Sequence, residues 1–273
     1  MPPAAPQPFP DHRRELTRRE SRLFAELKGR HGRKKSEFCV CEGVRACGEL
    51  FASAAAERIE LIAATRAVLE ENPLPAALDE KVAVVEEPAL RQLSGTVNSQ
   101  GILALVRRPL PPPPGTPVGD PYILALDRLG DPGNFGTILR TARAAGLHEV
   151  WYTEGSVDPF SAKVIRSALA AQFAMTLRGF ADLEALAEEA EKLGFGPLCL
   201  TDPHQGESCF LAPGLFDRTV IVIGSEAHGV GAAEGRRITI PMPGEFESLN
   251  AAQAATIVLF EAVRRAAAPG RAE

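Results

Sequence analysis

Apolar segments alternate with helical patterns along the first half of this chain. Segments of strand length lie at residues 38–43, 59–65, 81–87 and 101–108. Helical patterns occupy the intervals between them, at residues 44–56, 66–71 and 88–93. Because strands that alternate with helices form βαβ units, this rhythm predicts a compact α/β layer.

The second half of the chain repeats the alternation around longer apolar runs. Residues 122–126 (YILAL) and 219–223 (TVIVI) are almost wholly apolar, which is typical of parallel strands covered on both faces. Further strands are predicted at 149–153, 173–177 and 198–201, and helices at 160–171 and 182–193. The pattern predicts a Rossmann-like domain with a parallel sheet.

A proline-rich segment separates the two halves. Residues 109–117 read PLPPPPGTP, a sequence that favours the stiff polyproline conformation over a helix or an inner strand. We therefore predict a basic extension at 1–35, a small α/β domain at 36–108, a linker at 109–118 and a larger domain at 119–273.

The composition is that of an ordinary globular protein, with 45% hydrophobic and 24% charged residues. No apolar run reaches membrane-spanning length, and prolines stand near the N-terminus where a signal peptide needs an apolar core. We therefore expect a cytoplasmic protein. The five cysteines are an odd number without paired C-x-x-C spacing, which argues against a disulfide framework or a metal site.

The net charge of −5 conceals a strong asymmetry. Residues 11–35 carry ten Lys and Arg against four Asp and Glu, so this segment is +6 and the remainder −11. Such a segment is typical of an RNA contact, although a solvated helix has the same composition. Thr17 and Glu20 form a capping-box pattern that opens a predicted helix, and Phe24 and Leu27 give this helix an apolar edge.

Three glycine-rich turns follow predicted strands in the second half, within residues 127–146, 220–230 and 238–261. Open α/β sheets bind ligands at the carboxyl ends of their strands, so these turns form the candidate site. None has the G-x-G-x-x-G spacing of a dinucleotide-binding turn or the Gly-Lys-Ser/Thr of a P-loop. An NAD- or ATP-binding enzyme is therefore disfavoured.

The same turns carry three ordered motifs. They are Asn134-x-Gly136-x-x-x-Arg140-Thr141-Ala142, then Gly224-Ser225-Glu226-x-x-Gly229, then Ile240-Pro241-Met242 with Ser248-Leu249-Asn250. In this order they resemble the SpoU family, whose members are RNA 2′-O-ribose methyltransferases that use S-adenosylmethionine. The resemblance implies an α/β methyltransferase domain with a trefoil knot in its C-terminal segment, and it implies that RNA is the substrate.

The resemblance assigns catalytic roles to Asn134, Arg140, Glu226, Ser248 and Asn250. Helical geometry agrees for Arg140, because at ~100° per residue it points away from the apolar stripe of its helix. Each residue also has an ordinary explanation: Arg140 as solvated surface, Asn134 as a turn residue or N-cap, Glu226 as an exposed loop charge, and Ser248 or Asn250 as the cap of the last helix. A guanidinium rarely loses its proton, so Arg140 suits the orientation of a phosphate or ribose.

The resemblance also places S-adenosylmethionine against Gly224, Ser225, Gly229, Ile240, Met242 and Leu249. The glycines would let the backbone approach a ligand. The chain departs from the family at Ala168 and Ala170, where many relatives have a Ser-x-Gly pattern, and at Gln253, which replaces a small apolar residue. These departures change packing and leave the reactive groups in place.

The N-terminal half carries a weaker resemblance. Glu42-Gly43 and the segment 93–101 resemble the small substrate-binding domain that precedes the catalytic domain in many SpoU enzymes. That domain is similar in fold to ribosomal RNA-binding proteins. In the ordinary explanation, Gly43 and Gly101 serve turns and Glu42 caps a helix.

The leading hypothesis is methylation of ribosomal RNA, since a separate N-terminal domain accompanies that class more often than the tRNA class. The alternatives are a tRNA 2′-O-ribose methyltransferase and a catalytically inert knotted RNA-binding protein; retention of the motif side chains argues against inertness. The last predicted helix is apolar nearly all round, and the resemblance implies that it forms a homodimer interface. Arg140 of one subunit would then approach Ser248 or Asn250 of the other.

Overall fold

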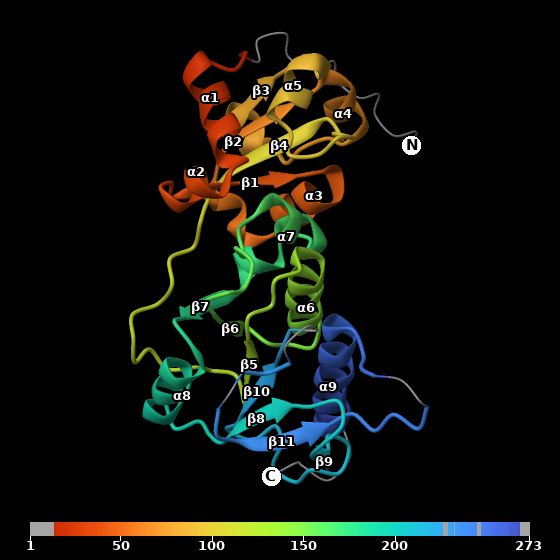
Figure 1. Ribbon diagram of the computed structural model, residues 1–273. Coiled ribbons are helices and arrows are strands. Elements are labelled where there is room, and N and C mark those ends of the chain that lie inside the picture. The colour runs from red at the N-terminus through yellow and green to blue at the C-terminus, as the bar shows by residue number, and fades with distance from the viewer. Residues whose placement is uncertain (1–13, 226–228, 232, 245–246, 268–273) are drawn as a thin grey trace. The chain divides into compact units, whose positions relative to one another are not determined.

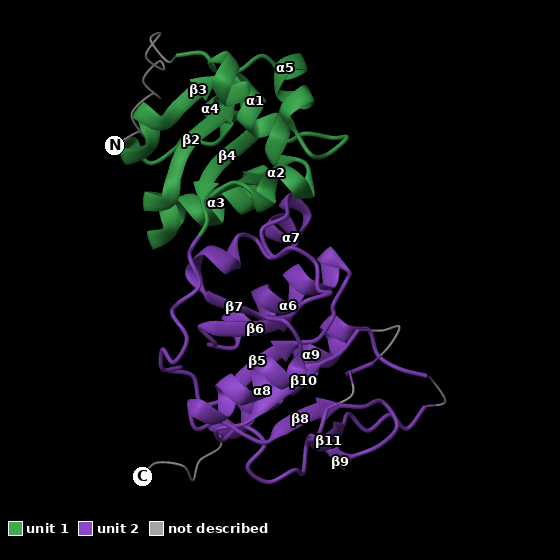
Figure 2. Ribbon diagram, turned by 60° about the vertical axis from the view of Figure 1, so that its left-hand side comes forward, with its two compact units in different colours: residues 1–108 green, residues 109–273 purple. Residues whose placement is uncertain are grey.

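The computed structural model describes residues 14–225, 229–231, 233–244 and 247–267. It divides into two compact units, residues 1–108 and 109–273, which Figure 2 colours separately. Each unit has its own sheet and its own hydrophobic core. The α/β fold with a smaller N-terminal unit, predicted from the alternating pattern, is confirmed.

The first unit is built on a four-stranded sheet in the order β1-β4-β2-β3. These strands are β1 (Phe38–Glu42), β2 (Ile59–Ala64), β3 (Val82–Val84) and β4 (Ile102–Arg107). Strands β2 and β3 are parallel, whereas β4 runs antiparallel to both β1 and β2. The helices are α1 (Arg18–Leu27), α2 (Arg30–Lys34), α3 (Val44–Ala52), α4 (Arg66–Glu71) and α5 (Glu87–Leu93), with 3-10 turns at Ala54–Arg58 and Ala76–Lys81.

Helix α1 begins at the predicted capping box. The Thr17 hydroxyl accepts the Glu20 backbone N–H at 3.3 Å, and the Glu20 carboxylate accepts the Thr17 N–H at 2.8 Å. Phe24 and Leu27 are both buried, in a core that also contains Leu61 of β2. The basic segment therefore contributes side chains to the packed body of the first unit.

Glu42 ends β1 with a buried carboxylate, which binds a loop far along the chain. It accepts the Thr96 hydroxyl at 2.6 Å, the Gly95 N–H at 3.1 Å and the Ser94 hydroxyl. The alternative role of Glu42 as a helix cap is wrong, because Gly43, in the left-handed region at φ 99°, occupies the N-cap of α3. The Glu42-Gly43 turn and the segment before β4 thus meet, as their joint resemblance to one domain suggested.

The second unit contains a seven-stranded parallel sheet in the order β7-β6-β5-β10-β8-β11-β9. The strands are β5 (Ile123–Leu126), β6 (Glu149–Thr153), β7 (Thr176–Phe180), β8 (Leu198–Thr201), β9 (Glu207–Ser208), β10 (Val220–Ile223) and β11 (Arg236–Thr239). The helices are α6 (Pro132–Ala144), α7 (Ala162–Ser167), α8 (Leu183–Lys192) and α9 (Ala251–Ala266), with a 3-10 turn at Ala171–Ala174.

The central strands β5 and β10 are covered on both faces, as their apolar sequences predicted. Leu124 and Ile221 belong to a core shared with α6 and α9. Ile123 and Val220 face the opposite way, into a core shared with α8. Figure 1 shows α8 on one side of the sheet and the pair α6 and α9 on the other. Every side chain of these two strands is buried, which explains their lack of polar alternation.

Helix α7 is shorter than its sequence pattern predicted. It ends at Ser167 because Leu169 and Ala170 adopt positive φ angles of 49° and 61°, which interrupt a right-handed helix. The chain then forms a 3-10 turn, so β7 begins at Thr176 rather than at the predicted residue 173. Ala170 is one of the two positions where the chain departs from the family's Ser-x-Gly pattern.

All five cysteines are buried and free, as expected from their spacing. Among the helices that the structure describes, none combines the length and the apolar content needed to cross a membrane.

Candidate active site

The site begins where β5 leads into α6. Asp131 caps this helix by accepting the Asn134 backbone N–H at 2.7 Å, and Pro132 occupies the first turn. The alternative in which Asn134 itself is the N-cap is therefore wrong. Its side-chain oxygen instead accepts the Nδ2 hydrogen of Asn250 at 3.1 Å.

The second part of the site lies where α9 begins. The Asn250 Oδ1 accepts the backbone N–H groups of Ala252 at 2.9 Å and Gln253 at 3.4 Å, so Asn250 is the N-cap of this helix and Ser248 is not. The other end of the same carboxamide donates to Asn134, 116 residues away in sequence. Asn250 thus caps a helix and joins the first motif to the third at the same time.

The glycines of the second motif are required by the turn after β10. A Cβ atom on Gly224 would lie 2.3 Å from the carbonyl carbon of Gly229, a distance that no side chain tolerates. The Gly229 N–H donates to the Ser225 carbonyl at 2.8 Å, and Gly229 has a φ of 60°. Gly224 is therefore needed because the backbone of Gly229, in the same turn, packs against it.

Beside this turn lies a cavity of about 400 Å³. All of the residues predicted to bind cofactor line it, namely Gly224, Ser225, Gly229, Ile240, Met242 and Leu249. Ser248 lines it as well. The volume lies within the range of small-molecule sites, which are typically ~300–1,000 Å³. The walls combine apolar side chains with exposed backbone groups, an arrangement that suits a flat heteroaromatic ring.

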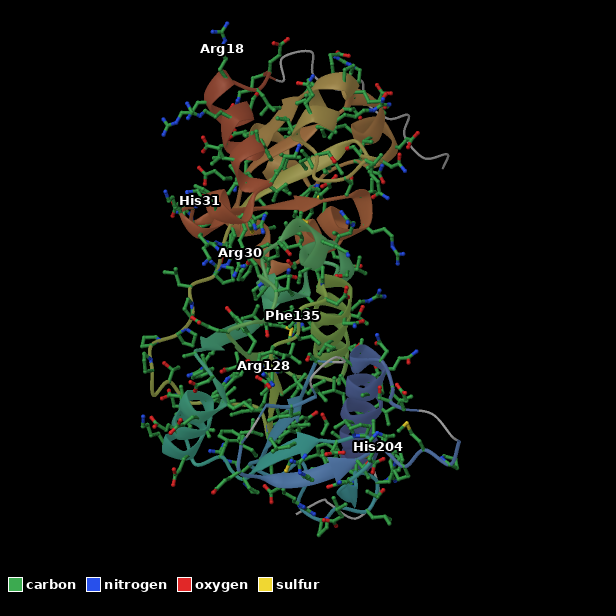
Figure 3. The ribbon with its side chains drawn as sticks, in the orientation of Figure 1. Arg18, Arg30, His31, Arg128, Phe135 and His204 are labelled. Atoms are coloured by element: carbon green, nitrogen blue, oxygen red, sulfur yellow. The ribbon has the colours of Figure 1, made fainter. Side chains whose placement is uncertain are left out.

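Thr201, Asp202 and His204, the last labelled in Figure 3, also line the cavity, and sequence reasoning assigned them no role. Thr201 ends β8, which pairs with β10, and Asp202 and His204 come just after it, so their position at a neighbouring strand end was the available signal. The Asp202 carboxylate accepts the backbone N–H groups of His204 and Gln205, both at 2.9 Å. These bonds, with Arg237 nearby, hold the Asp202 pKa below its ordinary value and keep the group ionised.

Among the predicted catalytic residues that the structure describes, Ser248 lines the cavity, whereas Asn134, Arg140 and Asn250 do not. Arg140 is exposed on α6, six residues beyond Asn134 and thus about 9 Å further along the helix axis, given ~1.5 Å per residue. Its outward direction agrees with the prediction, and it does not line the cavity. Glu226 lies outside the described residues. Within the described ranges, no cluster of three or more His, Cys, Asp or Glu side chains is placed to hold a metal ion.

Residues 121–260 match the model of the SpoU rRNA methylase family. The chain belongs to this family. A second match, to the MRM3-like substrate binding domain, covers residues 22–104 and falls within the first compact unit. The SpoU resemblance of the three motifs is therefore confirmed, and so is the relation of the N-terminal half to a substrate-binding domain.

Individual RNA methyltransferases are similar over much of the chain. An uncharacterized tRNA/rRNA methyltransferase of Synechocystis is 34% identical over 198 residues, which cover 68% of this chain and 70% of that protein. The 23S rRNA (uridine(2479)-2′-O)-methyltransferase of Streptomyces viridochromogenes is 30% identical over 60% of each chain. The structure of the SpoU methyltransferase AviRb from Streptomyces viridochromogenes in complex with AdoMet has a TM-score of 0.74 and 25% identity, covering 94% of this chain and all of that one.

Proposed function

We propose that this chain is an S-adenosylmethionine-dependent RNA 2′-O-ribose methyltransferase that acts on ribosomal RNA. One observation carries the proposal: the Asn134–Asn250 hydrogen bond joins the first and third motifs next to a cavity lined by the second and third. A binding cavity and the polar motif side chains thus lie at neighbouring strand ends of one sheet.

The cavity fits S-adenosylmethionine in size and in chemistry. Ile240, Met242 and Leu249 offer apolar surface to the adenine, while the Gly224 and Ser225 backbone offers polar groups. When bound, S-adenosylmethionine supplies a methyl group activated by its sulfonium charge. The protein's tasks are then to hold the cofactor and to align a ribose hydroxyl with that methyl group.

Arg140 is the proposed catalytic arginine. A guanidinium stays protonated at physiological pH, so its physical role is to orient the phosphate or ribose of the RNA, and its exposed position on α6 leaves it accessible to a large substrate. Asn134 and Ser248 stand closer to the cofactor cavity and would orient the reacting groups. Glu226 keeps its proposed catalytic role on the motif match alone.

Ribosomal RNA is favoured by the first unit. This unit matches a substrate-binding domain, and basic side chains project from it; Figure 3 shows Arg18 extending away from α1. A tRNA substrate is the alternative within the same chemistry. The alternative of an inert RNA-binding protein conflicts with the retained cavity and the joined motifs.

The active form is proposed to be a homodimer formed through α9. Phe260 is 47% exposed on this helix, and Ile257, one turn before it, is only partly buried. A large exposed aromatic side chain next to further apolar surface is typical of an interface. Arg140 of one subunit would then approach Ser248 or Asn250 of the other. The trefoil knot and the cytoplasmic location belong to this proposal and remain predictions.

Binding and activity assays test the proposal. Calorimetry should detect S-adenosylmethionine and neither NAD nor ATP. Purified enzyme should methylate ribosomal RNA from a strain that lacks the gene, at a ribose 2′-oxygen located by mapping. Arg140→Ala should keep cofactor binding and lose most methyl transfer. Methyl transfer to tRNA alone would contradict ribosomal RNA as the substrate and support tRNA instead. Cofactor binding without methyl transfer to any RNA would favour the catalytically inert RNA-binding protein.

Subunit exchange tests the shared site. Arg140→Ala and Ser248→Ala proteins, each inactive alone, are mixed and assayed for methyl transfer. If Arg140 and Ser248 of one site come from different subunits, each mixed dimer contains one intact site and one doubly altered site, so mixing should restore methyl transfer. A monomer at micromolar concentration in sedimentation would contradict the dimer, and a dimer whose mixtures show no rescue would contradict a site in which those two residues meet across subunits.

A further inference from the structure

Asp127 carries a buried carboxylate at the carboxyl end of β5, between this strand and the first motif. It is 2% exposed, and the motif pattern assigned it no role. Burial of an ionised carboxylate is costly unless hydrogen bonds replace the lost water. The partners of Asp127 therefore indicate why the fold retains it.

Both carboxylate oxygens of Asp127 accept hydrogen bonds. Oδ1 accepts the Thr153 hydroxyl at 2.7 Å, and that hydroxyl accepts the Arg128 backbone N–H at 3.0 Å. Oδ2 accepts the backbone N–H of Gly231 at 2.8 Å and the Nε hydrogen of Arg128 at 3.2 Å. Arg128, labelled in Figure 3, has a left-handed φ of 48°, which brings its side chain back to the carboxylate.

The Gly231 bond connects Asp127 to the turn after β10 across 104 residues of sequence. A Cβ atom on Gly231 would lie 3.1 Å from Asp127 Oδ2 and 2.9 Å from a terminal nitrogen of Arg128, so a side chain here would crowd both groups. Gly229, two residues earlier, lines the cavity, and its backbone packs against Gly224. A continuous backbone path thus runs from Asp127 to the cavity wall.

We infer that Asp127 is a positioning residue for the cofactor cavity. By holding Gly231, its carboxylate fixes the position of Gly229 against Gly224 and so preserves the wall on which S-adenosylmethionine lies. Asp127 does not line the cavity and its side chain is almost fully buried, so its effect on the cofactor is indirect. The inference rests on the proposed function for the identity of the ligand.

The opposite end of the same strand supplies a matched control. Asp120 is 6% exposed and precedes β5. It accepts two backbone N–H bonds, from His148 at 2.8 Å and from Glu149 at 2.9 Å. It therefore resembles Asp127 in burial, in charge and in accepting backbone N–H bonds. Its partners His148 and Glu149, however, do not adjoin any residue of the cavity lining.

The experiment compares Asp127→Asn with Asp120→Asn in the full-length protein, using S-adenosylmethionine as the probe. The isosteric Asp127→Asn change can place an NH2 group opposite Gly231 and removes the charge. A hydrogen bond to a charged group typically changes the equilibrium constant that it supports by a factor of ~10 or more. We therefore expect the affinity for S-adenosylmethionine, measured by calorimetry, to fall ~10-fold. The KM for cofactor should rise while the KM for RNA stays unchanged. Asp120→Asn should lower the melting temperature and leave cofactor affinity within about twofold.

If Asp127→Asn does not fold, Thr153→Val, which removes the donor to the other oxygen, replaces it and should give a smaller loss of affinity. The inference is overturned if the folded variant binds cofactor as tightly as the wild type, or if both aspartate variants lose affinity equally. A wild-type protein that binds no S-adenosylmethionine overturns the proposed function itself, an outcome that is distinct because it appears before any substitution.

Discussion

The two roles of Asn250 can be separated by one substitution. Aspartate caps helices as well as asparagine does, and its charge suits a helix N-terminus. Asn250→Asp therefore keeps an acceptor for the Ala252 and Gln253 N–H groups. It loses, however, the Nδ2 group that donates to the Asn134 oxygen at 3.1 Å. A carboxylate oxygen takes the place of this donor and faces the Asn134 oxygen. The cap is preserved and the connection between the motifs is broken.

The expected magnitudes differ for stability and for activity. The free energy of unfolding of Asn250→Asp should change by no more than ~0.5 kcal/mol, whereas Asn250→Ala should lose ~1 kcal/mol together with the cap. A lost neutral hydrogen bond is worth ~1 kcal/mol, and the opposed oxygens add repulsion. With ~1.4 kcal/mol per factor of ten, kcat/KM for methyl transfer should fall ~10-fold in Asn250→Asp and ~5-fold in Asn250→Ala, which lacks the repulsion.

The assay combines urea unfolding with methyl transfer to ribosomal RNA. Asp182→Ala is the control, because Asp182 caps α8 by accepting the Ala185 N–H at 2.9 Å and does not line the cavity. It should lose ~1 kcal/mol of stability without a change in kcat/KM. The reasoning is refuted if Asn250→Asp retains wild-type activity, or if activity follows stability across all three variants.

Three further predictions concern charge and stability. Replacing Arg18 and Arg30 by Gln should lower the slope of log affinity against log salt for RNA by up to ~0.7–0.9 per lost phosphate contact; an unchanged slope contradicts an RNA contact there. Ala170→Gly should raise the free energy of unfolding by up to ~1 kcal/mol in urea titrations, because glycine tolerates the φ of 61°; a loss would be contrary evidence. Hydrogen bonds from Arg264 and, to a lesser extent, from Arg265 lower the pKa of buried Glu261 to about 2. The ionised carboxylate therefore stabilises the fold fully above its ordinary pKa of 4.5, and this contribution is lost as the pH falls toward 2. Glu261→Gln should flatten the fall in melting temperature over that window, and an identical pH profile would contradict the assignment.

Local sequence patterns determined much of the fold. Strands β6 and β8 have the bounds that their apolar runs predicted, and α1 begins at the capping box of Thr17 and Glu20. The complete apolarity of β5 and β10 predicted their double coverage. These features depend on side chains within a few residues of one another, so periodicity and capping chemistry carry the information.

The six residues that the motifs assigned to the cofactor all line the cavity, and the helical position of Arg140 predicted its exposure. The motifs left open whether Asn134 and Asn250 cap helices, and they did not predict the hydrogen bond between the two side chains. Asp202 and His204 escaped notice because no local pattern distinguishes a cavity wall from an ordinary loop after a strand.

The tertiary structure alone decided the long-range partners of the polar groups. The bonds of Glu42 to Thr96 and of Asp127 to Gly231 join segments 54 and 104 residues apart. A buried carboxylate must find donors, but its own sequence neighbourhood does not specify where they lie. Strand order brings those donors within reach, and strand order follows from how whole faces of helices and sheets bury apolar surface together.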